Sequence, residues 1–317
     1  MHHIIKETVL CWDLKLKKLR KDLHIAGSPE RCEFRIVIED QDDRLFVCEK
    51  ISPAAYEHKV RIINTLEFLA SHNIGCIQPY IRNTKSEYIT RNDHGLWQLT
   101  RFVDGVPLQR PQYVFQRWRA KVLASFLIDL AKKSPGVDHL FPIQSFSIKD
   151  YIYELMDTIG IHEPELKKSI NPTIRFLEKQ FMGIHDTFPQ GFCHGDYHPL
   201  NVIWSDSGIN AVIDWEFCGY KPEIYDVANL VGCIGMEDPQ SLVGDLIAEL
   251  IQSLRQAKLF SDLSWRYLVE FMVALRFAWL SEWLRKSDQE MIELEQVYMR
   301  LLIDNKKKLM QFWGLKH

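Results

Sequence analysis

The stretch GFCHGDYHPLNVIWSDSGINAVIDWEFCGY, residues 191–220, decides the fold that we predict for this chain. Two short apolar runs within it, residues 202–204 and 209–213, flank the polar turn Ser205-Asp206-Ser207-Gly208. Short apolar runs separated by a tight polar turn are typical of an antiparallel β-hairpin. A turn centred between Ser207 and Gly208 would place Asn201 opposite Asp214.

Two oxygen-bearing side chains are therefore expected to meet at the open end of this hairpin. Directly opposed residues of an antiparallel pair have Cβ atoms about 4.5–5.5 Å apart. The amide oxygen of Asn201 and the carboxylate of Asp214 would form a site for a hard cation. Mg²⁺ prefers one or two protein ligands of this kind, with phosphate oxygens completing its octahedron.

A third carboxylate, Asp196, lies just upstream in a loop that contains Gly195. Phosphoryl transfer needs little covalent help from a protein, so a carboxylate that orients a hydroxyl and a metal that absorbs phosphate charge are sufficient. The three residues together predict phosphoryl transfer to a hydroxyl.

The loop resembles the H-G-D-x-H-x-x-N catalytic loop of the aminoglycoside phosphotransferase and choline kinase superfamily, through His194-Gly195-Asp196-Tyr197-His198-Pro199-Leu200-Asn201. Asp214-Trp215-Glu216 resembles the metal-binding D-x-[DE] of that family. The resemblance implies that Asp196 is the catalytic aspartate, that His198 supports the loop, and that Asn201 and Asp214 bind Mg²⁺. It also implies that Asp226 begins a helix and braces the catalytic loop.

The predicted fold class is α+β, a protein-kinase-like two-lobe fold with a small sheet-rich N-lobe and a larger, mainly helical C-lobe. The runs CEFRIVIE and RLFVCEKI, separated by DQDD, indicate a hairpin, and helical periodicity dominates beyond Pro107. We expect a nucleotide-binding lobe over residues 1–103, with the connection near residues 100–106. Residues 104–317 would form the catalytic and substrate-binding lobe.

The nucleotide-binding residues are expected in the first lobe. Gly27-Ser28-Pro29-Glu30-Arg31 stands where the family has its phosphate loop, but it contains a single glycine. The backbone of Thr100 and Phe102 would meet the edge of the base of ATP or GTP. The resemblance also implies a phosphate-binding lysine at the end of the strand at residues 45–51, with a glutamate of the following helix as its partner, Glu57 or its rival Glu67.

The identity of that lysine depends on the register of one strand. Alternation puts Glu49 and Lys50 on opposite faces, so that Val47 shares the face of Glu49. We predict that Lys50 faces the nucleotide, because an uncompensated carboxylate there would repel phosphates unless a second metal or an arginine such as Arg31 intervened.

Composition restricts the partners. Thirty-nine basic and forty-two acidic residues give a net charge of -3, so the chain has no basic field for nucleic acid or an anionic membrane. The seven cysteines form no C-x-x-C pair, which favours a reducing cytoplasm over a disulfide framework. The N-terminus does not resemble a signal peptide.

Several alternatives stay open at this point. The acceptor is an amino alcohol, a sugar, an aminoglycoside or a hydroxy amino acid, and the oligomeric state is undetermined. The rival function is a non-catalytic, nucleotide-binding kinase-like scaffold. A protein kinase is disfavoured because no extended peptide-binding segment precedes Asp226. Cys193 is interpreted as a small buried hydrophobe. Arg276 either binds an anionic substrate group or, as we favour, is a buried partner of Glu282 or Glu270.

Overall fold

The chain is described by a computed structural model that covers residues 1–141 and 146–316. It divides into two compact units. The first unit comprises Met1–Leu108, Lys133–Phe141 and Leu200–Cys218, and the second comprises the other described residues. The first unit holds an antiparallel sheet and the second is mainly helical, so the predicted α+β, kinase-like class is confirmed.

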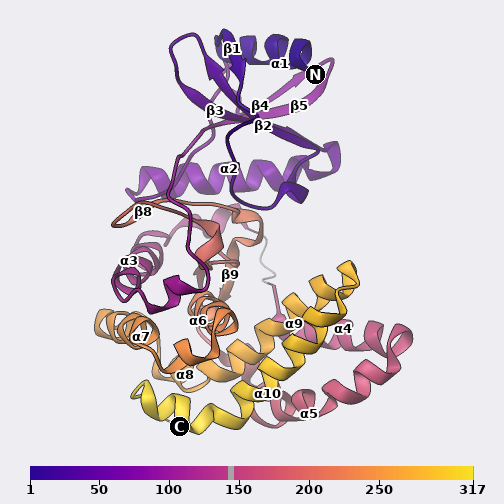
Figure 1. Ribbon diagram of the computed structural model, residues 1–317, viewed down its shortest axis with the longest axis vertical. Helices are drawn as coiled ribbons and strands as arrows, with labels where there is room; N and C mark the ends of the chain where they lie inside the picture. Colours follow the sequence, from indigo (N-terminus) through magenta and orange to yellow (C-terminus); the bar gives the residue numbers. More distant parts are fainter. Residues whose placement is uncertain (142–145, 317) are drawn as a thin grey trace. The chain divides into compact units, whose positions relative to one another are not determined.

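The first unit is built on a five-stranded antiparallel sheet in the order β1-β2-β3-β5-β4. Figure 1 shows α1 and α2 on opposite sides of this sheet. The helices and strands of this unit are α1 (His2–Val9), β1 (Leu16–Leu19), β2 (Phe34–Asp40), β3 (Leu45–Ile51), α2 (Tyr56–Ser71), β4 (Ile89–Asn92), β5 (Gly95–Arg101), β7 (Val202–Trp204) and β8 (Ile209–Val212).

Strand alternation separates the two faces of the sheet. Ile36, Cys48 and Leu99 point to the side of α1 and share one buried core with Ile5 and Val9. Their neighbours along each strand point to the opposite side. That second face therefore carries a different set of side chains, which includes charged residues.

The predicted hairpin is present as β7 and β8, but its register is not the predicted one. Val202 pairs with Val212, and the Ile213 N–H donates to the Asn201 carbonyl at 3.0 Å, so Ile213 and not Asp214 stands opposite Asn201. The reason is the turn, which is closed by a hydrogen bond from the Ser205 N–H to the Gly208 carbonyl. A bulge also shifts the pairing between Ile203 and Trp204. The turn is thus centred earlier than expected.

The second unit is mainly helical, as the periodicity beyond Pro107 predicts, and it also contains one two-stranded sheet of β6 and β9. Its helices and strands are α3 (Trp118–Lys133), α4 (Ile148–His162), α5 (Pro164–Gln180), β6 (Gln190–Cys193), β9 (Gly219–Pro222), α6 (Tyr225–Glu237), α7 (Asp245–Ala257), α8 (Asp262–Arg266), α9 (Leu268–Lys286) and α10 (Gln289–Phe312).

A buried ion pair joins α9 to α10. Arg276 donates through Nε to Glu295 at 2.7 Å and also through Nη2, and Trp283 Nε1 donates to the same carboxylate at 3.1 Å. The predicted partners are therefore wrong, because Glu282 pairs with exposed cations of its own helix and Glu270 pairs with Lys306. Burial without Glu295 would leave the guanidinium uncompensated.

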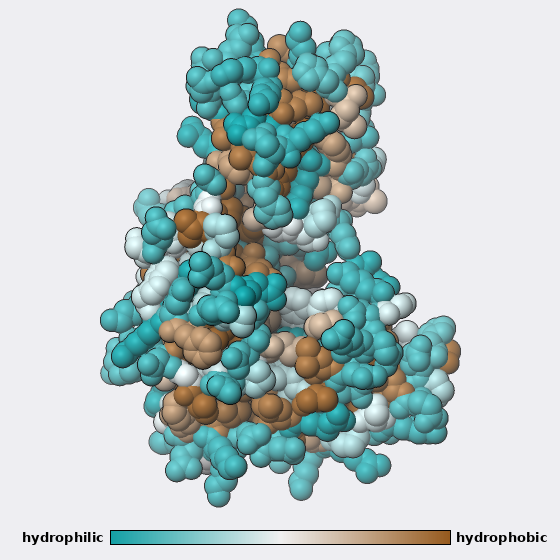
Figure 2. All heavy atoms as spheres, viewed as in Figure 1, coloured by the Kyte–Doolittle hydropathy of each residue, from teal (hydrophilic) through white to brown (hydrophobic). Residues whose placement is uncertain are grey.

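In the part of the chain that is described, no helix has the length and apolarity to span a membrane. The surface in view in Figure 2 is largely hydrophilic, with hydrophobic residues in small groups.

Removing the carboxylate of Glu295 should destabilise the protein strongly. Glu295→Ala leaves Arg276 buried without its partner, at a cost of about 3–5 kcal/mol in the free energy of unfolding. The matched control, Glu282→Ala, removes a partly exposed partner of the exposed Arg285 and should cost less than about 1 kcal/mol. Urea unfolding of both variants measures the difference, and equal costs would contradict the structural role of this pair.

Candidate active site

The predicted catalytic loop follows β6 and is held by one buried carboxylate. Asp226, in the first turn of α6, accepts hydrogen bonds from the backbone N–H groups of His194 at 2.7 Å and Gly195 at 2.8 Å. Gly195 has a φ of 85°, a left-handed conformation that a residue with a side chain adopts at a cost. The resemblance implies this bracing role for Asp226, and the two hydrogen bonds provide it.

Asp226 is 3% exposed, and its burial raises the pKa of the carboxyl to about 6. The two N–H groups act in the other direction because they favour the ionised form. The ionised carboxylate has lost its hydration and depends on these two backbone hydrogen bonds. A change in the loop that breaks either bond would destabilise the ionised form of Asp226.

Asp196 and His198 lie close together in this loop. His198 Nε2 is 3.5 Å from Asp196 Oδ1, and the Asp196 side chain keeps 20% of its surface exposed. The His198 ring meets the ring of Trp279 edge to face, with centroids 5.6 Å apart. Tyr197, which separates Asp196 and His198 in the sequence, is buried and stacks on Phe126 with ring centroids 5.0 Å apart. The loop therefore buries Tyr197 and His198 and leaves the Asp196 carboxylate accessible.

Cys193 precedes the loop and is 2% exposed. Burial raises the pKa of its thiol well above the ordinary value, which keeps the sulfur protonated. Its predicted interpretation as a small buried hydrophobe is consistent with this environment.

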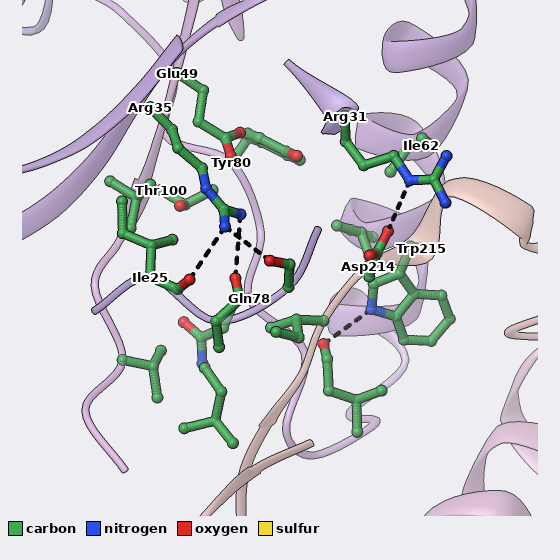
Figure 3. A pocket seen from close by; sticks show the side chains of 18 of the residues that line it. Ile25, Arg31, Arg35, Glu49, Ile62, Gln78, Tyr80, Thr100, Asp214 and Trp215 are labelled. Atoms are coloured by element: carbon green, nitrogen blue, oxygen red, sulfur yellow. Dashed lines mark hydrogen bonds and ion pairs between the residues drawn. The ribbon is translucent and has the colours of Figure 1, made fainter. Parts of the chain in front are cut away.

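A cavity in the first unit lies against the second face of the sheet (Figure 3). Its walls are residues of β2, β3 and α2, the segments at residues 78–80 and 100–103, and the β7–β8 hairpin with the residues that follow it. Thr100 and Phe102, predicted to meet the base, both line it. Ile62 and Leu66 of α2 contribute apolar surface.

The orientation of β3 is the reverse of the predicted one. Val47 and Glu49 line the cavity, whereas Lys50 lies on the face of Cys48 and its Nζ is 3.1 Å from Glu33. The apolar core beneath α1 explains the difference, because it takes Cys48 and thereby fixes the face of Lys50. Glu49 is accommodated by Gln98, whose Nε2 donates to its carboxylate at 2.7 Å.

The predicted helical glutamates do not reach this cavity. Glu57 and Glu67 are exposed on α2 and are not among the residues that line it. Lys59 of the same helix does line it, is 3% exposed and forms an ion pair with Glu216. Burial raises the pKa of Glu216, but hydrogen bonds from His58 and Lys59 outweigh it and hold the pKa below its ordinary value.

Asp214 lies at the edge of the cavity in a left-handed conformation, with a φ of 64°. Its Oδ2 accepts a hydrogen bond from the Ser28 N–H at 3.3 Å, and its Oδ1 is 3.7 Å from Arg31 Nε (Figure 3). The Arg31 guanidinium also lies 4.8 Å from the centre of the Phe217 ring. Asp214 is thus surrounded by groups that stabilise negative charge.

The oxygen-bearing residues suit a metal that keeps phosphate ligands. Asn201 directly precedes β7, Asp214 follows β8 by two residues, and Asn201 is 5% exposed. Among the described residues, no group of three or more His, Cys, Asp or Glu side chains is placed to hold a metal ion. A carboxylate and an amide oxygen are hard ligands suited to Mg²⁺.

Two cavity residues were missed by sequence reasoning. Lys59 stands three residues before Ile62, on the apolar stripe of α2, and a lysine on such a stripe signals a buried ion pair. Arg35 of β2 pairs with Glu49, and Val37 pairs with Val47. Because Arg35 and Val37 share one face of β2, knowing that Val47 and Glu49 face the cavity would have placed Arg35 on the cavity face.

The sequence model of the phosphotransferase enzyme family matches residues 30–260. The chain therefore belongs to this family, and the predicted resemblance is confirmed.

A curated relative, a homoserine kinase of Parvibaculum lavamentivorans, is 24% identical over 172 residues. The match covers 52% of this chain and 50% of the relative, so the chain spans about half the length of that protein.

Solved structures share the fold over nearly the whole chain. An aminoglycoside phosphotransferase of Alicyclobacillus acidocaldarius has a TM-score of 0.64 at 13% identity, covering 96% of this chain and 93% of its own. An amicoumacin kinase in complex with AMP-PNP and Ca²⁺ has a TM-score of 0.65 at 13% identity, with 94% and 92% covered. A GDP complex of an aminoglycoside 2'-phosphotransferase has a TM-score of 0.65 at 17% identity, with 96% and 98% covered.

Replacing Asp226 by asparagine should loosen the catalytic loop. The amide of Asp226→Asn offers one acceptor oxygen and presents N–H donors to the second backbone N–H, at a cost of about 1–3 kcal/mol. Urea unfolding at neutral pH should give a lower midpoint than the wild type. Asp157→Asn, on the exposed face of α4, is the control and should leave the midpoint unchanged.

The difference between the wild type and Asp226→Asn should depend on pH. The pKa of Asp226 is about 6 in the folded protein against an ordinary 3.8, so the folded state holds this proton more tightly than the unfolded state. The resulting stabilisation is present below about pH 4 and is lost as the pH rises through about 6. The urea midpoint of the wild type should therefore fall relative to that of Asp226→Asn between these values, and a constant difference would contradict the raised pKa.

Proposed function

We propose that this protein catalyses the Mg²⁺-dependent transfer of the γ-phosphoryl group of ATP or GTP to a hydroxyl of a small molecule. The observation that carries the proposal is the accessible Asp196 carboxylate beside His198, in a loop fixed by the buried Asp226. A positioned carboxylate that accepts the hydroxyl proton is the protein's main contribution to this chemistry.

Asn201 and Asp214 would hold the Mg²⁺, which supplies charge neutralisation at the phosphates when bound. Their hard oxygen ligands fit that ion, and Arg31 beside Asp214 favours the ionised carboxylate that a metal ligand needs. In this proposal Asp196 orients the acceptor hydroxyl, and His198 holds Asp196 in place.

The nucleotide would bind in the cavity of the first unit. The backbone of Thr100 and Phe102 would meet the base edge, and apolar side chains of α2 and β7–β8 would contact its faces. Similar solved structures contain AMP-PNP in one case and GDP in another, so both donors are candidates here. Lys50 is not assigned to the phosphates, because it lies on the other face of the sheet.

The acceptor that we favour carries an amine as well as a hydroxyl, as in amino alcohols, hydroxy amino acids and aminoglycosides. Trp279, beside His198, is partly exposed and stacks on Trp283 with ring centroids 6.1 Å apart. An aromatic face next to the catalytic loop suits an ammonium group. The homoserine kinase relative adds weight to a hydroxy amino acid.

A non-catalytic, nucleotide-binding scaffold is the alternative that the reversed β3 orientation favours, since the family's phosphate-binding lysine is missing from the cavity. The retained Asp196, Asn201 and Asp214 outweigh this observation. The seven free cysteines favour a reducing compartment, and we propose a cytoplasmic location.

Nucleotide turnover with a panel of acceptors tests the proposal directly. Labelled ATP and GTP with Mg²⁺ are supplied with homoserine, choline, a simple sugar and kanamycin, and phosphorylated products are separated. We expect turnover with at least one amine-bearing acceptor, and Asp196→Ala should reduce it by about 100- to 10,000-fold. Asp157→Ala is the control, and turnover that survives in Asp196→Ala would contradict the assignment.

Asp214→Asn should weaken nucleotide binding that depends on Mg²⁺ more than Asp196→Asn does. Loss of a ligand charge at the metal affects the bound ground state, with an expected loss of about 10-fold or more in nucleotide affinity. Calorimetric titration with Mg²⁺ and with EDTA measures the effect, and Asp206→Asn in the exposed turn of the same hairpin is the control. Equal affinities in all variants would count against a metal at Asp214.

A further inference from the structure

The loop between β1 and β2 lines the cavity although it has almost none of the glycine expected of a phosphate loop. Ile25, Ala26, Gly27 and Ser28 all belong to the wall of the cavity, and Gly27 has a φ of 85°. Pro29 follows and opens a short 3-10 turn. Something other than glycine content must therefore fix the direction of its peptide groups.

One guanidinium binds four consecutive carbonyls of this loop. Arg35 Nη2 donates to the Ile25 carbonyl at 3.1 Å and to the Gly27 carbonyl at 2.7 Å. Its Nη1 donates to the carbonyls of Ala26 and Ser28, each at 3.3 Å. Figure 3 shows the Arg35 side chain reaching from the sheet to these carbonyls.

The charge of Arg35 is directed to the backbone and not to its strand neighbour. Glu49 stands directly opposite Arg35 in the β2–β3 register, where an ion pair would be the simple expectation. Instead Glu49 accepts its hydrogen bond from Gln98 at 2.7 Å. The planar guanidinium presents five N–H donors in a fixed geometry, whereas an ammonium group presents three, so one lysine could not donate a separate N–H to each of four carbonyls.

Carbonyls that point to one side send the next N–H groups to the other. In a trans peptide the C=O and the following N–H point in opposite directions, and the cis bond of the described chain lies elsewhere, at Arg110-Pro111. The N–H groups of Ala26, Gly27 and Ser28 therefore point away from Arg35. Because the four carbonyls converge on one guanidinium, these N–H groups do not converge on one target, and the Ser28 N–H is the one that meets an anionic group in the structure.

The last N–H of this series already meets an anionic group. The Ser28 N–H donates to the Asp214 carboxylate at 3.3 Å, so this side of the loop faces the predicted metal ligand and accepts negative charge. The space beside Asp214 is where the phosphates belong in the proposed function.

We propose that Arg35 is a positioning residue for phosphate recognition: it holds the carbonyls of residues 25–28 and thereby fixes the Ser28 N–H of this glycine-poor loop, which donates to the phosphates of the bound nucleotide. The inference rests on the proposed function for the identity of the anion. Arg35 lines the cavity, but in this role it acts through the backbone, which supplies the contact to phosphate.

The test separates phosphate affinity from base affinity. Dissociation constants for ATP and adenosine, and for GTP and guanosine, are measured by calorimetry with Mg²⁺ for the wild type, Arg35→Met and Arg35→Lys. We expect triphosphate affinity to fall about 10- to 100-fold in both variants, with nucleoside affinity unchanged. Arg91→Met, an exposed arginine on β4 outside the cavity, is the control and should match the wild type.

A second pair of variants removes the N–H itself. Ser28 has a φ of -71°, which proline adopts, so Ser28→Pro deletes this N–H without forcing that angle. Ser28→Ala keeps the N–H and loses only the hydroxyl that caps the following turn. Triphosphate affinity should fall in Ser28→Pro and persist in Ser28→Ala, even if Arg35→Met does not fold.

Three outcomes are decisive. Full triphosphate affinity in Arg35→Lys would show that charge alone is needed and would overturn the proposal. Equal affinities in Ser28→Pro and Ser28→Ala would overturn it as well. A wild type that binds neither nucleotide would instead refute the proposed function, so the two failures are distinguishable.

Discussion

The buried carboxylate of Asp226 is the constraint on which the catalytic loop depends. Two consecutive backbone N–H groups, from His194 and Gly195, are satisfied by this one side chain, which fixes the direction of the chain just before Asp196. Because Asp226 belongs to α6, the helix sets where Asp196 stands. A single buried acceptor on a rigid helix thus fixes the position of Asp196, the proposed catalytic residue.

The sequence pattern of this part of the candidate site is local. His194 to Asn201 lie within one short loop, and a separate requirement selects each residue type, with Gly195 selected by its positive φ, Asp196 by its charge and Tyr197 by burial. The hairpin that follows was predicted as an element, but its register was not. The four polar residues of its turn allow two centres, and only the bulge at Trp204 decides between them.

The orientation of β3 was not predictable for a different reason. Alternation establishes which residues share a face, but Val47 and Cys48 are both apolar and buried, so neither face is marked as the core. The decision comes from α1, whose Ile5 and Val9 pack on the side of Cys48. Tertiary packing likewise determines the partner of Arg276. That partner, Glu295, lies on α10, so no residue spacing within α9 could indicate it.

The reversed strand changes how phosphate can be recognised in the first unit. With Glu49 in the cavity, the carboxylate opposes phosphate binding, and the buried Lys59 is engaged by Glu216. The donors near Ser28 are then the Arg31 guanidinium and backbone N–H groups, and the backbone groups help only if the loop is held in one conformation. A loop fixed by Arg35 and Pro29 loses less conformational entropy when an anion binds than a glycine-rich loop does. In the proposed arrangement the same rigidity carries a cost, because the Ser28 N–H already donates to Asp214 and a phosphate would have to replace that carboxylate.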